Sequence, residues 1–98
     1  MNCADALNRL RAHADAIKAM GATSLYLFGS TAHDSAKVAS DLDLFVDYGQ
    51  RGRFNAFDLV GIKLFPEKEL ALPVDLTTRD GLHPMLKADI EKTAIRAF

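Results

Sequence analysis

Three aspartates stand at spacings that could bring their carboxylates together: Asp41, Asp43 and Asp75. Residues 41–47 have a period of two, with the acids and Phe45 on one side and Leu42, Leu44 and Val46 on the other, so Asp41 and Asp43 leave the same face of a strand whose other face is apolar. Asp75 lies between two apolar residues in another short strand, and it emerges on the same side if those neighbours face the core. The sequence therefore predicts three carboxylates on one exposed sheet surface.

Such a cluster needs compensation for its charge. Two carboxylates about 5 Å apart repel by roughly 3 kcal/mol at an effective dielectric constant of about 20. Uptake of a proton by one carboxyl group is one answer, and a divalent cation is the other. Carboxylate oxygens favour Mg²⁺ or Mn²⁺ over zinc, and two such ions about 3.5–4 Å apart would activate an attacking oxygen and stabilise a leaving pyrophosphate. Alternating acids on an exposed strand are also commonly just solvated.

A Gly-Ser pair adds a second kind of chemistry. Gly29 and Ser30 directly follow the apolar stretch 24–28, and ten residues separate Ser30 from Asp41. Glycine lets the backbone approach a ligand closely, and a helix or turn that starts just after it presents free N–H groups to phosphate. Gly-Ser at the end of a strand is usually only a turn. The prediction of a triphosphate cradle therefore depends on the joint pattern Gly-Ser-(ten residues)-Asp-x-Asp.

Hydrophobic periodicity predicts the elements that must position these residues. The expected order is a helix over 5–20, a strand over 24–28, a brief helix or turn over 31–37, a strand over 41–47, a helix over 54–65 that Pro66 disturbs before a last turn over 67–70, and a strand over 74–77. A final helix is expected to begin at an N-cap, Asp80, and to carry Leu82, Leu86, Ile90, Ala94 and Ala97 on one stripe. This alternation predicts an α/β (α+β) fold, a small mixed β-sheet covered by helices, in a single domain over 1–98.

Composition limits the class of protein. The chain has 98 residues, a net charge of −1 and one cysteine, Cys3. A lone thiol cannot close an internal disulfide and suits a reducing compartment, and no apolar run approaches the ~18 residues of a membrane span. The first residues do not resemble a secretory signal. We expect a cytoplasmic protein without a membrane segment, and the balanced charge argues against direct binding of nucleic acid.

Taken together, these motifs resemble the minimal nucleotidyltransferases (MNT) of the DNA polymerase β-like superfamily. More narrowly, they resemble the MntA-type antitoxins of HEPN–MNT toxin–antitoxin systems. The resemblance spans roughly residues 21–98 and rests on four runs: 27–30 (Leu-Phe-Gly-Ser), 40–46 (Ser-Asp-Leu-Asp-Leu-Phe-Val), 58–64 (Asp-Leu-Val-Gly-Ile-Lys-Leu) and 73–76 (Pro-Val-Asp-Leu). It implies the nucleotidyltransferase fold, which is similar to the palm of polymerase β.

The resemblance also implies roles for individual residues. Asp41 and Asp43 would bind two Mg²⁺ ions, with Mn²⁺ as a possible substitute, and Asp75 would be the third catalytic carboxylate. Gly29 and Ser30 would hold the triphosphate of ATP. The implied reaction moves AMP onto a hydroxyl, which in the antitoxins is a tyrosine of the partner HEPN toxin, an RNase that the modification silences. Asp75 would take the proton of that hydroxyl or help a metal to do so.

One departure from the family pattern concerns the segment after Ser30. The family often continues with Arg-Ala-Arg-Gly, whereas residues 31–34 here are Thr-Ala-His-Asp. Loss of both arginines is expected to weaken phosphate binding. His33 could replace one of them as a phosphate donor, or it could be an exposed histidine in a turn.

Two alternatives to an active antitoxin enzyme remain at this point. The chain could be a binding module of weak or absent activity that neutralises a toxin by complex formation alone. It could also be a catalytic subunit that needs a separate protein to bind the acceptor. The complete set of acids favours an enzyme, because contact alone would not require them. All three readings require a partner protein.

Overall fold

The computed structural model describes residues 3–29, 42–49, 56–70 and 73–98. The helices in these ranges are α1 (Cys3–Ala12), α2 (Ala14–Ala19), α3 (Ala56–Leu70) and α4 (Lys87–Thr93), with a 3₁₀ turn η1 (Arg79–Gly81). The strands are β1 (Ala22–Phe28), β2 (Leu42–Tyr48), β3 (Val74–Thr78) and β4 (Ile95–Arg96). They form one sheet in the order β3-β2-β1-β4, in which β2 and β3 are parallel and the other two pairs are antiparallel. The expected mixed sheet with helices is confirmed.

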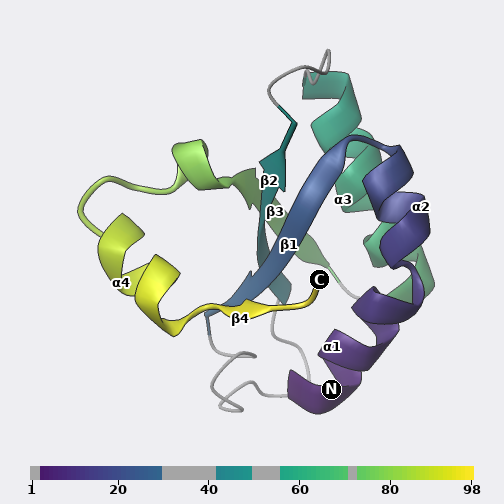
Figure 1. Ribbon diagram of the computed structural model, residues 1–98, viewed down its shortest axis with the longest axis horizontal. Helices are drawn as coiled ribbons and strands as arrows, with labels where there is room; N and C mark the ends of the chain where they lie inside the picture. The colour runs from purple at the N-terminus through teal and green to yellow at the C-terminus, as the bar shows by residue number, and fades with distance from the viewer. Residues whose placement is uncertain (1–2, 30–41, 50–55, 71–72) are drawn as a thin grey trace.

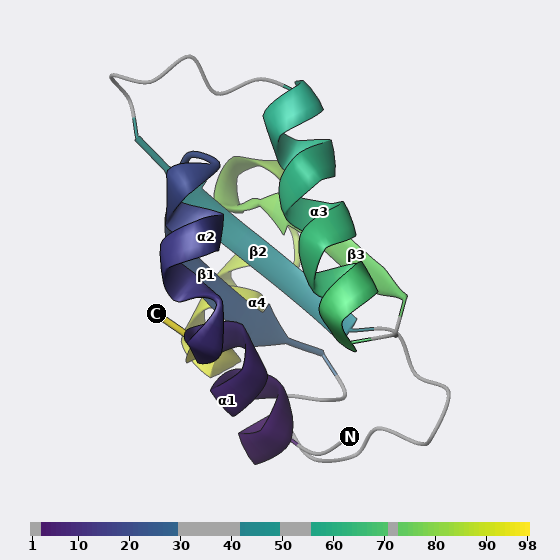
Figure 2. The same cartoon turned by 90° about the vertical axis from the view of Figure 1, so that its right-hand side faces the viewer.

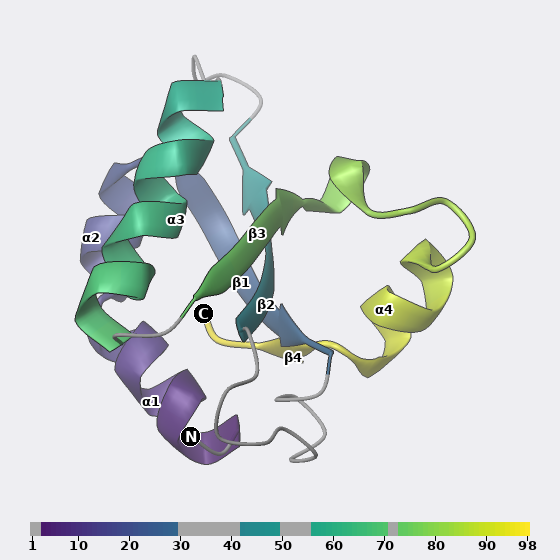
Figure 3. The ribbon, with the colours of Figure 1, turned by 180° about the vertical axis from the view of Figure 1, so that it is seen from behind.

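The helices are divided between the two faces of the sheet. Helices α1, α2 and α3 lie together against one face, and α4 lies on the opposite side (Figures 1 and 2). Seen from behind, α3 runs beside β3, the edge strand that follows it in the chain (Figure 3). One face of the sheet is therefore covered by a continuous helical layer, and the other is left for side chains that need access to solvent or ligands.

Apolar side chains of the strands and the three helices fill the space between sheet and helical layer. In β2 the alternate residues Leu42, Leu44 and Val46 are fully buried, whereas Asp43 and Asp47 are only half-buried on the opposite face. The rest of this core is drawn mainly from β1 and the helices: Leu7, Leu10, Ile17, Leu25, Leu27 and Ile62. The alternation in β2 thus has the predicted register, with the leucines toward the helices and the acids away from them.

The first helical segment differs from the single helix expected over 5–20. The chain turns at His13, whose backbone N–H bonds to the carbonyl of Leu10 in a tight three-residue turn. The imidazole of His13 meets the ring of Phe65 edge-on at a centroid distance of 5.2 Å and lies 3.7 Å from the carboxylate of Glu69. The turn separates α1 from α2 and places His13 against α3.

Pro66 does not interrupt α3, contrary to expectation. The helix is continuous from Ala56 to Leu70 although proline cannot donate the backbone hydrogen bond to Ile62. A proline inside a helix costs about 3 kcal/mol relative to alanine. Pro66 is buried, so packing of its ring offsets part of this cost.

The C-terminal segment is the largest departure from the sequence prediction. The expected long helix after Asp80 is replaced by η1, a link over 82–86 that ends in a hydrogen-bonded turn, the short helix α4 and the strand β4. Pro84 accounts for the late start of α4, because the residue before a proline avoids the helical conformation. Thr78, rather than Asp80, caps the turn, by accepting the N–H of Gly81 at 3.1 Å. Ala94 then turns to an extended conformation, and Ile95–Arg96 pair with β1.

Membrane insertion finds no support in the described part of the chain, where every helix is too short or too polar to cross a bilayer.

Candidate active site

Asp43 and Asp75 are direct neighbours in the sheet. Asp43 of β2 pairs in register with Asp75 of β3 on one side and with Phe28 of β1 on the other. Adjacent strands are about 4.8 Å apart, so side chains at paired positions on one face can reach a common ligand. Asp43 is half-buried and Asp75 is exposed. The sheet therefore brings together two of the three predicted carboxylates, on the face that α1, α2 and α3 leave open.

Gly29, which follows β1, lies against the side chain of Asp43. Its backbone has a φ of 78°, a conformation that residues with a side chain rarely adopt. A Cβ atom added to Gly29 would collide with the Oδ2 atom of Asp43. Only glycine lets the chain turn this tightly beside the carboxylate. The structure therefore places Gly29 directly beside the carboxylate of Asp43, and the roles of Gly29 in triphosphate binding and of Asp43 in metal binding stay predictions.

The remaining predicted site residues lie outside the described residues. These are Ser30, His33 and Asp41. Among the residues that the structure describes, no three metal-binding side chains gather at one point. The roles of Ser30, His33 and Asp41 thus stay predictions from the sequence.

Asp43 and Asp75 fit a hard divalent cation by chemistry and by placement. Both offer carboxylate oxygens, the ligands that Mg²⁺ and Mn²⁺ prefer. Their parallel pairing aligns them across two strands, and Asp41 stands only two residues before Asp43 in the chain. Gly29 leaves room beside the Asp43 carboxylate that any other side chain would fill.

An aromatic row adjoins the carboxylates on the same face. Phe45, the next residue of β2 on this face, is fully buried and pairs with Tyr26 of β1. The rings of Tyr26 and Phe45 are stacked at a centroid distance of 4.7 Å and an angle of 14°, and Phe28 packs against Phe45 at 5.8 Å. The row forms an apolar floor beside Asp43.

Arg79 covers this floor, and sequence reasoning did not single it out. Its guanidinium carbon lies 4.9 Å from the ring centre of Tyr26 and 5.1 Å from that of Phe45. Nε and one terminal nitrogen donate to the two oxygens of Asp47 at 2.7 and 3.0 Å, and the other terminal nitrogen donates to Glu91 of α4 at 2.6 Å. These hydrogen bonds raise the pKa of Arg79 above its ordinary value, so it stays charged.

The signal for Arg79 was present in the alternation of β3. Positions 75, 77 and 79 continue one face, just as positions 43, 45 and 47 do in β2. Extending both series by one step places Arg79 beside Asp47 once the strands are paired. The pairing of β2 with β3 could not be predicted from the sequence, so the contact between Arg79 and Asp47 could not be predicted either.

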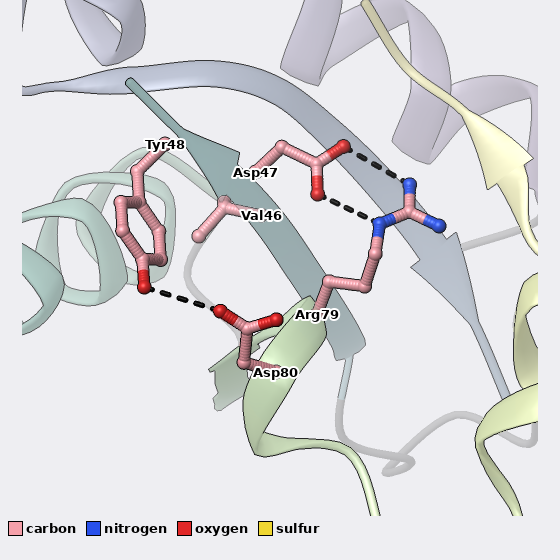
Figure 4. Close-up of a pocket in the computed structure, with 5 residues that line it drawn as sticks. All are labelled: Val46, Asp47, Tyr48, Arg79 and Asp80. Carbon is pink, nitrogen blue, oxygen red and sulfur yellow. Dashed lines mark hydrogen bonds and ion pairs between the residues drawn. The ribbon is translucent and has the colours of Figure 1, made fainter. Parts of the chain in front are cut away.

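A small pocket of about 170 Å³ lies where β2 and β3 end. It is lined by Val46, Asp47, Tyr48, Arg79 and Asp80, and Figure 4 shows Asp47 facing Arg79 on one side and Tyr48 facing Asp80 on the other. The Tyr48 hydroxyl donates to Asp80 at 3.2 Å. This hydrogen bond, together with the negative charge of Asp80, raises the pKa of the exposed Tyr48 hydroxyl.

Comparison with known protein families gives one match that covers most of the chain. Residues 10–97 match the family described as "Nucleotidyltransferase domain". The match includes β1, β2 and β3, and thus Gly29, Asp43 and Asp75.

Similar proteins of known sequence come from Methanocaldococcus jannaschii. One, named as a candidate protein adenylyltransferase, is 38% identical over 69 residues, which are 70% of this chain and 72% of the relative. A second protein of that organism, with the same kind of name, is 32% identical over 73 residues, which are 74% of this chain and 72% of the relative.

Solved structures share the fold. The structure of a candidate minimal nucleotidyltransferase aligns with a TM-score of 0.74 and 32% identity, over 97% of this chain and 95% of the other. A toxin–antitoxin crystal structure with AMP-PNP aligns with a TM-score of 0.70 and 15% identity, over 90% of this chain and 72% of the other. A mutant of the MntA–HpeT toxin–antitoxin aligns with a TM-score of 0.65 and 15% identity, over 100% of this chain and 73% of the other. At 15% identity the last two show similarity of fold alone.

Proposed function

This chain belongs to the nucleotidyltransferase domain family, and from that premise we propose that it is a metal-dependent adenylyltransferase whose acceptor is a partner protein. In this proposal AMP passes from ATP to a hydroxyl, a tyrosine of a HEPN-type toxin, and the chain acts as the antitoxin. The single observation that carries the catalytic part is the in-register pairing of Asp43 with Asp75 beside the tight turn at Gly29.

In this proposal the carboxylates bind the cation, and a separate set of residues binds the triphosphate. Asp43, Asp75 and the predicted third ligand Asp41 would hold Mg²⁺, which supplies positive charge that neutralises phosphate oxygens and favours ionisation of an attacking hydroxyl. Backbone N–H groups after Gly29 and the hydroxyl of Ser30 would hold the triphosphate, and His33 would donate to it in place of an arginine.

The reaction balances as a displacement at the α-phosphorus of ATP. The acceptor oxygen forms a bond to that phosphorus, the bond from the phosphorus to the bridging oxygen breaks, and pyrophosphate leaves. Asp75 is the exposed member of the pair, so its carboxylate can take the proton of the acceptor hydroxyl. Asp43, half-buried and pressed against Gly29, is better suited to hold its position than to exchange protons with solvent.

The choice of a protein acceptor is supported by the relatives. The proteins of Methanocaldococcus jannaschii carry names of protein adenylyltransferases, and two solved structures of the same fold are of toxin–antitoxin complexes. The HEPN identity of the partner and tyrosine as the acceptor follow from the sequence resemblance.

A transfer assay tests the proposal directly. The purified chain is incubated with ATP labelled at the α-phosphate, Mg²⁺ and a HEPN-type protein, and label on that protein is measured. Asp43→Asn and Asp75→Asn are each expected to reduce the rate by about 10²-fold or more, since each removes a group that acts in the transition state. Asp89→Asn changes an exposed carboxylate on α4 and serves as the matched control.

Two results would contradict the proposal. Full transfer by the Asp43→Asn variant would refute the site. Tight binding of the HEPN protein without transfer of any nucleotide would refute the enzymatic function and leave an antitoxin that acts by contact.

A further inference from the structure

We propose that Arg79 is a positioning residue that fixes the register of the edge strand β3 on β2 and thereby the distance between the Asp43 and Asp75 carboxylates. The inference rests on the proposed function, because it takes those carboxylates as the ligands of the cation. It adds to that function a residue that touches neither the cation nor the nucleotide, and it explains why a network of polar contacts is built beyond the end of β3.

The strand that carries Asp75 is weakly held by the sheet alone. β3 has five residues and lies at the edge of the sheet, with β2 as its neighbour in the described part of the chain. Side chains alternate between faces, so a slip of one residue would turn Asp75 toward the helical layer. A slip of two residues would carry it about 6.6 Å along the strand. Either movement would separate the two carboxylates.

Arg79 closes the ladder in the correct register. Asp75 and Arg79 are four residues apart, as are Asp43 and Asp47 on the paired strand. The register that aligns Asp43 with Asp75 is therefore the one that brings Arg79 beside Asp47. Two parallel hydrogen bonds of 2.7 and 3.0 Å join them, a two-pronged geometry that loses both bonds when either strand slides.

The guanidinium is itself held from three sides. Asp47 holds it from β2, the rings of Tyr26 and Phe45 support its flat face, and Glu91 of α4 binds the remaining terminal nitrogen at 2.6 Å. Only 30% of the Arg79 side chain is exposed, although it lies at the rim of the sheet. Lysine could keep the charge but not the fork or the stacking.

The other end of β3 has a separate anchor. The backbone N–H of Val74 donates to Glu67 of α3 at 2.9 Å, and the N–H of Leu42 donates to the carbonyl of Pro73 at 3.0 Å. Asp75 thus lies between an anchor on α3 and the clamp formed by Arg79. Because the first anchor is not changed by a substitution at Arg79, such a variant tests the clamp alone.

Titration of the protein with Mn²⁺, followed by NMR, tests the inference without any turnover. Paramagnetic broadening of backbone amides in β2 and β3 around Asp43 and Asp75 reports occupancy of the site. Arg79→Lys is expected to require about 10-fold more Mn²⁺ for half-maximal broadening, the usual order for residues that orient metal ligands. Arg79→Ala is expected to lose more, and Arg79→Lys serves if Arg79→Ala does not fold.

Arg96→Lys is the matched control. Arg96 also reaches across strands, donating to the hydroxyl of Ser24 at 3.2 Å, but it does so from β4 at the opposite edge of the sheet. This variant should bind Mn²⁺ with the affinity of the unmodified protein. In the transfer assay, Arg79→Lys should raise the half-saturating Mg²⁺ concentration about 10-fold while KM for ATP at saturating Mg²⁺ changes less than about 2-fold.

Hydrogen exchange separates positioning from general stability. In Arg79→Lys the amides of β3 should exchange faster while those of β1 keep their rates. Unchanged Mn²⁺ affinity in this variant, or equal loss of protection in β1 and β3, would overturn the inference. Absence of broadening near Asp43 and Asp75 in the unmodified protein would instead overturn the cation site and the proposed function, and the exchange rates of β3 would still decide whether Arg79 is a clamp.

Discussion

Gly29 has both an unusual backbone conformation and a close contact with a proposed catalytic carboxylate. Its left-handed conformation turns the chain sharply after β1, and its lack of a side chain lets that turn touch the Asp43 carboxylate. Both properties are lost together when any other residue is introduced. Stability and activity should therefore respond to the same substitution at this position.

Gly29→Ala is expected to lower the free energy of unfolding by about 1–3 kcal/mol, because a Cβ is strained at this φ and collides with the carboxylate. Nucleotide transfer should fall with it. Gly61→Ala is the control: apart from its chain neighbours and the backbone of α3 itself, nothing lies within 4 Å of the added Cβ, so this variant should gain roughly 0.5–1 kcal/mol. Denaturant unfolding of the two variants measures both effects, and equal stability of the two would contradict the role of Gly29.

At the scale of elements, β2 organises the molecule. It is an inner strand between β1 and β3, its Leu42, Leu44 and Val46 face the helical layer, and its acids face the open side together with Phe45. Leu44 lies at its centre, fully buried, and pairs with Leu27 and Leu76. The burial of Leu44 and Leu27 fixes which way Asp43 points.

Leu44→Ala is accordingly expected to cost about 2–5 kcal/mol, since it leaves a cavity beneath the strand that carries Asp43. Leu64→Ala, on the exposed side of α3 with 54% of the residue accessible, should cost less than about 1 kcal/mol. Thermal or denaturant unfolding of both variants checks the contrast. A similar loss in the two would mean that the core does not lie where the structure places it.

The elements also show what a sequence can predict. The alternation in 41–47 was sufficient to place Asp43 on the open face, because a strong period of two and a core requirement point the same way. The final helix was mispredicted because its apolar stripe was read through Pro84, whose effect on the preceding residue dominates locally. The contact of Arg79 with Asp47 and the order of the strands both depend on which distant segments pair. Periodicity within one segment carries no information about that pairing.

At the scale of the whole molecule, the proposed cation site ties local charge to global stability. Folding places two carboxylates side by side on β2 and β3, and a ligand that binds only the folded chain stabilises it. Cation binding should therefore be visible in unfolding experiments as well as in activity.

Mg²⁺ at ten times its dissociation constant is expected to raise the free energy of unfolding by about 1.4 kcal/mol, and EDTA should reverse the effect. Thermal unfolding at matched ionic strength measures this shift, and Asp43→Asn should abolish most of it. An equal response of the unmodified protein and the variant would place the cation elsewhere on the surface.

The pairing of β4 with β1 has a consequence for folding during synthesis, because the sheet cannot be completed until the last residues have been made. The backbone of Leu25 bonds to Ala97 and Phe98, so β1 acquires its second neighbour only when residues some seventy positions later have left the ribosome. Until then a nascent chain exposes an open strand edge, the kind of surface on which unfinished sheets aggregate. Fragments that stop at Ala94 should therefore be poorly soluble even though they contain every carboxylate of the proposed site.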